Sequence, residues 1–136
     1  MKTIKISMLA LVLGLMSFSV NSIHKTPIVK VISNGVTWKT ETVDVGEIPQ
    51  GTPKVIEFQF TNTGKTEVII TNVHGSCGCT ATDFPKDSIA PGKSAIIKAT
   101  YNAANVGSFT KTVTVTTNVE ETPKVLTFKG TVLAKI

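Results

Sequence analysis

The sequence predicts an all-β fold in which two antiparallel sheets pack face to face, a sandwich of about seven strands. After residue 22 the chain consists of short alternating runs of Thr, Val, Ile and Phe, the residues that favour strands. Turn residues (Gly, Pro and Asn) recur at intervals of roughly ten residues, as in sandwiches. No segment shows the ~3.6-residue period of a helix. The crossover helices that a parallel sheet needs are therefore not expected.

The first part of this region predicts a hairpin followed by a longer strand. Residues 28–32 and 36–40 are both strand-like, and Asn34-Gly35 between them is a strong signal for a tight turn. We expect residues 43–46 to continue the second strand. Residues 47–51, which contain Pro and Gly, are expected to end it.

The clearest strand signal covers residues 55–61. Apolar and polar side chains alternate there without interruption, which predicts one face on a core and one in water. The apolar set is Ile56, Phe58 and Phe60, and the polar set is Glu57, Gln59 and Thr61. The apolar set is therefore predicted to be buried and the polar set exposed. A turn at 62–65 and a strand at 67–73 follow.

Four further segments complete the predicted sandwich. Residues 89–92 (Ile-Ala-Pro-Gly) read as a turn, because Pro presets φ and Gly accepts a positive φ. One strand precedes a loop at 102–107 and two strands follow it, with Lys129 exposed in the last. The alternating residues expected to face the core are Ala95, Ile97, Ala99 and Tyr101, then Phe109, Val113 and Val115, then Leu126, Phe128 and Val132.

The first 22 residues are interpreted as a signal peptide. Lys2 and Lys5 form a short basic start, and an apolar run from about residue 6 to residue 18 follows. This run is shorter than the roughly 20 residues that span a bilayer. A permanent anchor is therefore not expected, and the mature part contains no second long apolar stretch.

The predicted cleavage site fixes the expected compartment and the mature chain. Val20 and Ser22 suit the two positions that a signal peptidase reads, which favours cleavage after Ser22, with cleavage after Ser19 as the alternative. The mature protein, residues 23–136, has the size of one domain with one core. We expect it to be periplasmic or secreted.

The charge pattern argues against nucleic-acid binding. All fourteen basic residues are lysines, against nine acidic residues. Removing Lys2 and Lys5 leaves twelve lysines and a net charge of +3, spread along the chain without a basic run. Recognition of nucleic acid uses clustered basic residues, and arginine in particular. A solvated surface is the better interpretation.

Cys77 and Cys79 are the only cysteines, and Gly78 separates them. A disulfide between them would persist in an exported protein, but it would close a very small ring. In the loop-entropy model such a ring contributes only about 1.5 kcal/mol. On an extended strand the two α-carbons would lie near the upper limit for a disulfide, so Gly78 would have to bend the chain.

Four interpretations of this pair remain open. The simplest is two structural thiols, or a local disulfide, that shape a bend between strands. Dithiol chemistry would suit redox exchange, although no thioredoxin-like pattern surrounds the pair. His74, Cys77 and Cys79 could bind copper(I) or zinc, but a structural zinc site needs about four ligands. A Cys–His nucleophile would need a third orienting group.

Other residues with chemical potential carry weaker signals. His24 lies near the mature N-terminus and could bind a metal. Asp83 and Asp87 could form an acid–base pair or a calcium loop, but a polar turn is the simpler interpretation. Trp38 could stack on a ligand, although a partly buried core aromatic is commoner. No catalytic motif and no cofactor-binding motif is recognised, so neither an enzyme nor a cofactor is expected.

A series of short motifs carries a family resemblance. The motifs are Asn62-Thr63-Gly64, Ser76-Cys77-Gly78-Cys79-Thr80, Ile89-Ala90-Pro91-Gly92, Gly107-Ser108-Phe109, Thr117-Asn118 and Phe128-Lys129-Gly130. The series, over about residues 36–132, resembles an uncharacterised family of exported bacterial proteins with a Cys-Gly-Cys-Thr signature. That family is similar to immunoglobulin-like domains of the abnormal-spindle/Hydin type and, more remotely, to major sperm protein. The resemblance implies an immunoglobulin-like sandwich and brings no established activity.

The sequence therefore predicts a non-catalytic module of unknown specific function. Open sheet edges can accept a strand from a partner, so an envelope protein or assembly is the expected partner. The alternative is a small thiol-redox or soft-metal-binding protein that uses Cys77 and Cys79.

Overall fold

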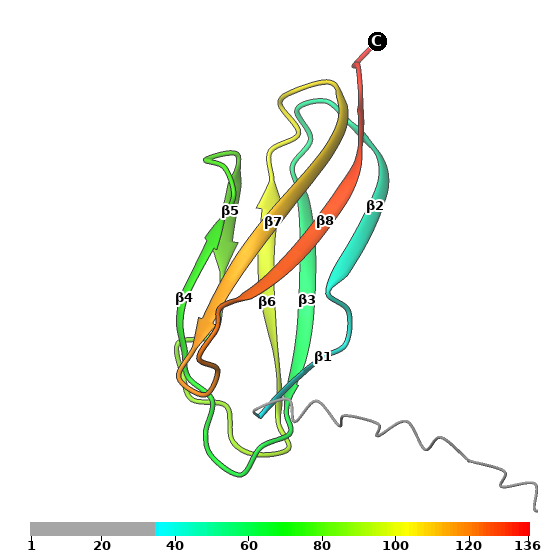
Figure 1. Cartoon of the computed structure of the whole chain (residues 1–136). Coiled ribbons are helices and arrows are strands. Elements are labelled where there is room, and N and C mark those ends of the chain that lie inside the picture. Colours follow the sequence, from blue (N-terminus) through cyan, green and yellow to red (C-terminus); the bar gives the residue numbers. More distant parts are fainter. Residues whose placement is uncertain (1–34) are drawn as a thin grey trace, which may run out of the picture. The chain divides into compact units, whose positions relative to one another are not determined.

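Among the residues that the structure describes, eight strands form two four-stranded sheets that pack face to face (Figure 1). The computed structural model describes residues 35–136. The sheets have the orders β1-β3-β6-β5 and β2-β8-β7-β4. The strands are β1 (Val36–Trp38), β2 (Thr42–Pro49), β3 (Lys54–Asn62), β4 (Ile70–Gly75), β5 (Thr80–Asp83), β6 (Ser94–Tyr101), β7 (Gly107–Thr117) and β8 (Lys124–Leu133). The predicted all-β sandwich is confirmed. The signal peptide, the strand at 28–32 and His24 lie outside the described residues.

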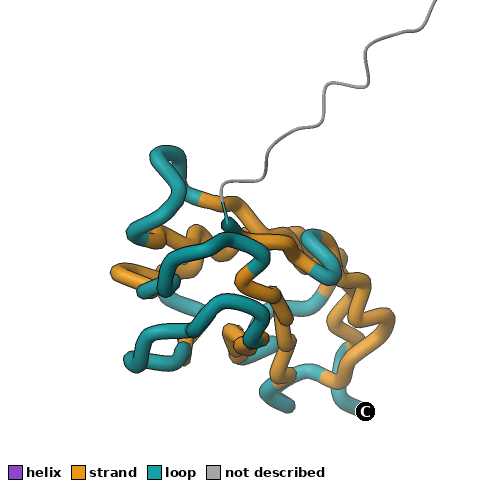
Figure 2. Tube along the Cα trace, turned by 90° about the horizontal axis from the view of Figure 1, so that it is seen from below, coloured by secondary structure: helices purple, strands orange, loops and turns teal. Residues whose placement is uncertain are grey.

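Seen from one end of the sandwich, the described residues consist of strands and loops (Figure 2). No helix among residues 35–136 is long and apolar enough to cross a membrane. The β2–β3, β4–β5 and β6–β7 connections lie at the same end as the C-terminal residues (Figure 1). Hydrogen bonds join them there, since Gly51 N donates to Ala103 O and Asn102 N donates to Cys79 O.

The space between the sheets is filled by the apolar faces that the alternation predicts. Phe58, Phe60 and Phe128 expose 0%, 1% and 0% of their surface. The Tyr101 and Phe109 rings stack at a centroid distance of 4.4 Å beside Phe128. All five side chains belong to one continuous core, so the two sheets are held together by burial of apolar surface.

The polar faces follow the same alternation with two exceptions. Glu57 and Lys129 are exposed, as expected. Gln59 and Thr61 are only half-exposed, which corrects the expectation for these two side chains. The reason is their place in the sheet: β3 lies between β1 and β6, and Ile96 stands opposite Gln59 on β6.

The β2 strand departs from the predictions in length and direction. It continues through Pro49, although residues 47–51 were expected to end it. Gly46, with φ +67°, forms a bulge that shifts the register between Asp44 and Glu47 and returns Ile48 to the core. β2 also pairs with β8 in parallel, so the sandwich is not purely antiparallel. β2 and β8 are far apart in sequence, and the strands between them in the chain, β3 to β7, supply the long connection that parallel pairing needs.

The first strand is shorter than expected and lies in the other sheet from β2. Val36 pairs with Asn62 and Trp38 with Phe60, so β1 is an edge strand beside β3. The chain then changes sheets between β1 and β2, and residues 43–46 do not continue β1. Gly35, at φ +97°, accepts hydrogen bonds from Thr63 and Gly64. The other half of the predicted hairpin lies outside the described residues.

Two strands around the cysteines also differ from expectation. β4 begins at Ile70, because Val68 forms an isolated bridge with Ile89 instead. β5 was not predicted at all: four residues, Thr80–Asp83, pair with β6 as an edge strand. The short length of β5 left its alternation too brief to recognise. Together with the separation of β1 from β2, it brings the strands among residues 35–136 to eight.

Candidate functional site

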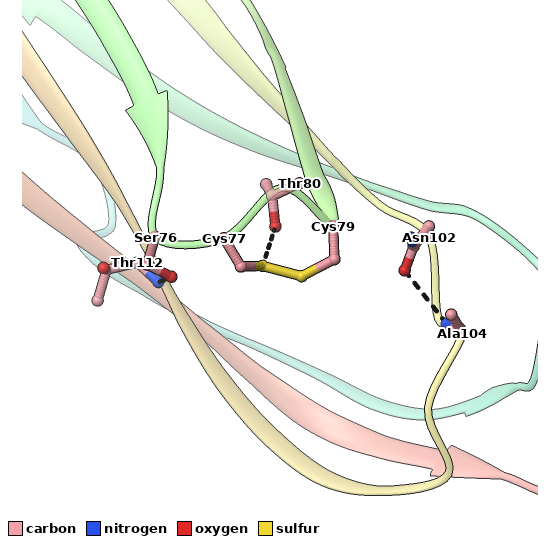
Figure 3. Close-up of a disulfide and its surroundings, with 7 residues drawn as sticks. All are labelled: Ser76, Cys77, Cys79, Thr80, Asn102, Ala104 and Thr112. Atoms are coloured by element: carbon pink, nitrogen blue, oxygen red, sulfur yellow. Dashed lines mark hydrogen bonds between the residues drawn. A yellow bond between two sulfur atoms is a disulfide. The ribbon is translucent and has the colours of Figure 1, made fainter.

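The cysteine turn, residues 76–79, joins β4 of one sheet to β5 of the other. A disulfide links Cys77 and Cys79, whose α-carbons are 5.2 Å apart (Figure 3). This separation lies within the usual disulfide range, because the segment is a turn and not an extended strand. Thr80 N donates to Cys77 O at 3.3 Å, which closes the turn around Gly78.

Backbone contacts hold the cysteine turn on both sides. Ser76 N donates to Thr112 O at 2.9 Å, and Thr112 N donates to Ser76 Oγ at 3.1 Å. On the other side Asn102 N donates to Cys79 O at 3.1 Å. Gly75 is also required, since a Cβ there would lie 2.9 Å from Thr80 Cβ. The turn is therefore fixed by bonds that do not involve sulfur.

The two sulfurs have different surroundings. Both cysteines are half-buried, but Cys79 is the one that packs against the core. Thr80 Oγ1 lies 3.7 Å from Cys77 Sγ (Figure 3). Because a disulfide sulfur carries no hydrogen, the Thr80 hydroxyl must be the donor. Thr80 itself is buried, so its hydroxyl is held in place.

The structure does not gather the other predicted candidates into one site. His74 is exposed on β4, where its Nδ1 lies 3.5 Å from the Asn72 amide. Among residues 35–136, no group of three or more His, Cys, Asp or Glu side chains is arranged to bind a metal ion. Asp83 ends β5 opposite Lys98, and Asp87 is exposed in the following bend.

Trp38 belongs to the half-buried edge of the core. Its ring lies 5.0 Å from that of Phe60, measured between centroids. The indole Nε1 is buried and has no hydrogen-bond partner among the described residues. This packing fits the interpretation of Trp38 as a sandwich aromatic.

A second candidate surface, which no sequence pattern predicted, lies at the loop end of the sheet that contains β2, β8 and β7. Leu133 pairs with Pro49 on one side. On the other side Gly107 pairs with Val132, which places Val106 beside Leu133. Val106 and Leu133 expose 54% and 45% of their surface. Pro49, Leu133 and Val106 are named the apolar row.

A shallow polar cleft adjoins the apolar row. Its volume is about 320 Å³, and it lies where β2 bulges away from β8. The side chains at its edges include both signs of charge and several hydroxyls: Asp44, Glu47, Lys129, Ser108, Thr110 and Thr131. Three strands distant in sequence contribute to the row and the cleft, so no local motif could have revealed them.

Comparisons with known proteins identify a family and a fold. The family model described as "Protein of unknown function (DUF1573)" matches residues 36–132. No curated protein matches the chain in sequence. The expected membership of an uncharacterised family is confirmed, whereas the Cys-Gly-Cys-Thr signature and export stay predictions.

Several solved structures share the sandwich. A protein of unknown function from Porphyromonas gingivalis W83 matches with a TM-score of 0.62 and 14% identity over 71% of this chain and 46% of its own. The ASH/PapD-like domain 7 of human CEP192 gives 0.60 and 9% over 76% and 88%. The secreted serine protease VesC from Vibrio cholerae gives 0.58 and 14% over 74% and 24%. The chain thus spans less than half of the two bacterial proteins, and these likenesses show the immunoglobulin-like fold alone.

Proposed function

This chain belongs to the DUF1573 family of proteins of unknown function, and we propose that it is an exported, non-catalytic immunoglobulin-like module that binds another protein of the cell envelope. The observation that carries this proposal is the apolar row beside the polar cleft. Val106 and Leu133 are exposed although they are large and apolar, and the residues that adjoin them in the chain, Gly107 and Val132, are paired. Exposed apolar residues rimmed by polar groups are characteristic of protein interaction sites.

The composition of this surface favours a protein over other partners. An apolar row next to Asp44, Glu47 and Lys129 combines an apolar centre with a charged rim, the usual anatomy of a protein interface. β2 is also an edge strand, whose outer side can accept a further strand. A partner with an apolar anchor and an extended segment would use both features.

Two features support export and a non-catalytic role. The signal-peptide pattern and the Cys77–Cys79 disulfide both suit an oxidising compartment. No hydrogen bond joins the candidates His74 on β4 and Asp83 on β5, since the His74 Nδ1 lies 3.5 Å from the Asn72 amide instead. A catalytic site needs such groups within hydrogen-bond reach of one another.

Export is tested by N-terminal sequencing of protein recovered from the periplasm or medium. We expect the chain to start at Ile23, or at Val20 if the alternative cleavage is used. A product that starts at Met1 and sediments with membranes would contradict export as a free protein.

Partner binding is tested by cross-linking and affinity capture of the tagged full chain from envelope extracts. The variant Val106→Asp/Leu133→Asp should lose a partner that wild type retains, because charges replace the apolar row. Val55→Asp is the matched control, since Val55 is equally exposed at 51% but lies on the other sheet. The captured protein must then bind the purified chain directly. Equal capture by all three chains would overturn the proposed surface.

Thiol exchange is a second candidate function, favoured by the contact between Thr80 and Cys77. The small ring adds little stability, yet the turn around it is firmly anchored and one sulfur receives a hydroxyl donor. Intact mass of the protein from its native compartment, with and without reductant, shows whether the pair cycles. Metal analysis of the same sample tests the soft-metal alternative.

A further inference from the structure

The cysteine turn has the features of an asymmetric exchange site. We propose that the Cys77–Cys79 disulfide exchanges with a dithiol of a partner protein or peptide, that Cys77 is the sulfur bonded to the partner, and that Thr80 is its positioning residue. Cys79 is then the leaving sulfur when a partner dithiol reduces the disulfide, and the resolving sulfur when the reduced pair acts on a partner disulfide. This inference rests on the second candidate function, thiol exchange, and assigns a role to each residue of that site.

The choice of Cys77 follows from the surroundings of the two sulfurs. Cys79 packs against the core, which hinders the approach of a partner to its sulfur. Cys77 is half-exposed and does not belong to that packed set. Exchange rates depend on which sulfur is accessible, so the partner reacts at Cys77.

The two sulfurs differ not only in accessibility but also in hydrogen bonding, because Thr80 contacts only that of Cys77. Its hydroxyl donates toward Cys77 Sγ already in the disulfide. The same bond is stronger when the acceptor is a thiolate, because hydrogen bonds to ions are stronger than those to neutral groups. Thr80 therefore stabilises the reduced form and increases the thiolate fraction of Cys77. Both effects make the disulfide a better oxidant.

The exchange balances without any further reactant. A partner thiolate attacks Cys77 Sγ and forms a mixed disulfide, while the Cys77–Cys79 bond breaks and its electron pair leaves on Cys79. The second partner thiolate then attacks the partner's own sulfur in the mixed disulfide and releases Cys77. The partner loses two electrons and becomes a disulfide, and the two protons of its thiols pass to Cys77 and Cys79. A partner disulfide runs the same steps in reverse.

The fold allows this cycle without large rearrangement. Reduction breaks only the S–S bond, whereas the hydrogen bonds of Ser76 with Thr112 and of Cys79 with Asn102 do not involve sulfur and remain. The two sulfurs consequently stay close together, which favours resolution of the mixed disulfide over its accumulation.

The test compares single-thiol variants of the full chain in their reaction with glutathione disulfide between about pH 5 and pH 9, the range around a cysteine pKa. Cys79→Ser, which leaves Cys77, should react about tenfold faster at neutral pH than Cys77→Ser. Adding Thr80→Val to Cys79→Ser should slow the reaction roughly three- to tenfold and move its pH profile upward, whereas Thr80→Ser should not. Circular dichroism confirms that each variant folds.

The outcomes separate this inference from the function on which it rests. Wild type should equilibrate with mixtures of reduced and oxidised glutathione, and Thr80→Val should require more reduced glutathione to become half reduced, because its reduced form has lost the hydroxyl donor. Exchange in wild type with equal rates for both single-thiol variants and no effect of Thr80→Val would overturn the role assignment alone. A disulfide that reduced glutathione and a dithiol peptide both fail to reduce would overturn thiol exchange itself.

Discussion

The core between the sheets and the cysteine turn differ in what they contribute. Phe58, Phe60 and Phe128 are fully enclosed, and the burial of such side chains is the main stabilising term in folding. Cys77 and Cys79 are half-exposed in a turn whose covalent ring is too small to stabilise the fold much. The buried core therefore supplies most of the folding free energy, whereas the reactive sulfur atoms lie in the cysteine turn, which supplies little of it. The sandwich is therefore expected to persist whether the cysteine pair is oxidised or reduced.

The largest effect is expected in the core. Phe60→Ala should lower the free energy of unfolding by roughly 3–5 kcal/mol, the usual loss on truncating a buried aromatic. It also removes the ring on which Trp38 packs. This loss is a large share of the ~5–15 kcal/mol available to a domain. Urea unfolding measures it, with the exposed neighbour Glu57→Ala as control.

A loss below about 1 kcal/mol, far under the range for buried aromatics, would contradict the burial of Phe60. In that case the core and the cysteine turn would not differ in their contribution to the free energy of unfolding in the way proposed.

Asn62 is a buried polar residue at the end of β3 whose side chain is fully hydrogen-bonded. Its Nδ2 donates to Thr66 O and Ile89 O, both at 2.8 Å, and its Oδ1 accepts from Gly64 N at 3.0 Å. Asn62→Ala should cost about 2–3 kcal/mol, because buried carbonyls lose their donors. Asn118 is the control: it makes similar bonds to Ile69 N and Glu67 O but is exposed, so Asn118→Ala should cost less. Thermal and urea unfolding of both variants test the difference, and equal losses would count against it.

Replacement of both cysteines should destabilise the protein less than truncation of a core aromatic. Cys77→Ala/Cys79→Ala should fold to the same sandwich and lose no more than about 2 kcal/mol, since a small ring restricts the unfolded chain little. The serine double variant serves as a comparison that keeps polarity at both positions. Circular dichroism and urea unfolding check this. Failure of both double variants to fold would show that folding depends on the cysteine pair, and that the pair stabilises the domain as strongly as the core does.

The smallest effect concerns Glu120, beside the start of β8. Burial raises the pKa of its carboxyl, against the lowering influence of Lys124 and of the Thr117 hydroxyl. Because the folded state binds this proton more tightly than the unfolded state does, protonation of Glu120 stabilises the folded protein. This stabilisation is fully present below the unfolded-state pKa of about 4.3 and is lost as the pH rises through the folded-state pKa.

Glu120→Gln should therefore gain stability relative to wild type as the pH rises through this acidic window. The gain should be about 0.5 kcal/mol or less, because solvent screens a half-exposed group. Unfolding temperatures from about pH 3 to pH 7, a range that spans carboxyl titration, measure it, with the exposed neighbour Glu121→Gln as control. An equal difference at every pH would show that ionisation of Glu120 is not the cause.

The sequence alone determined the class of fold and most of the core. Strict alternation at residues 55–61 fixes which side chains face inward, since a strand repeats every two residues. The closeness of Cys77 and Cys79 along the chain likewise makes a local disulfide a candidate on spacing alone. Its chemical use could not be decided from spacing, because the donor Thr80 and the core contact of Cys79 depend on the geometry of the turn.

Only the tertiary structure decided which strands are neighbours. The parallel pairing of β2 with β8, the bulge at Gly46 and the edge strand β5 all depend on contacts between residues far apart in sequence. The same holds for the apolar row, because the pairing of Pro49 with Leu133 and of Gly107 with Val132 joins segments far apart in sequence. Alternation records burial locally, residue by residue, whereas strand order follows from the packing of the whole chain. The candidate surfaces arise from strand order and not from local pattern.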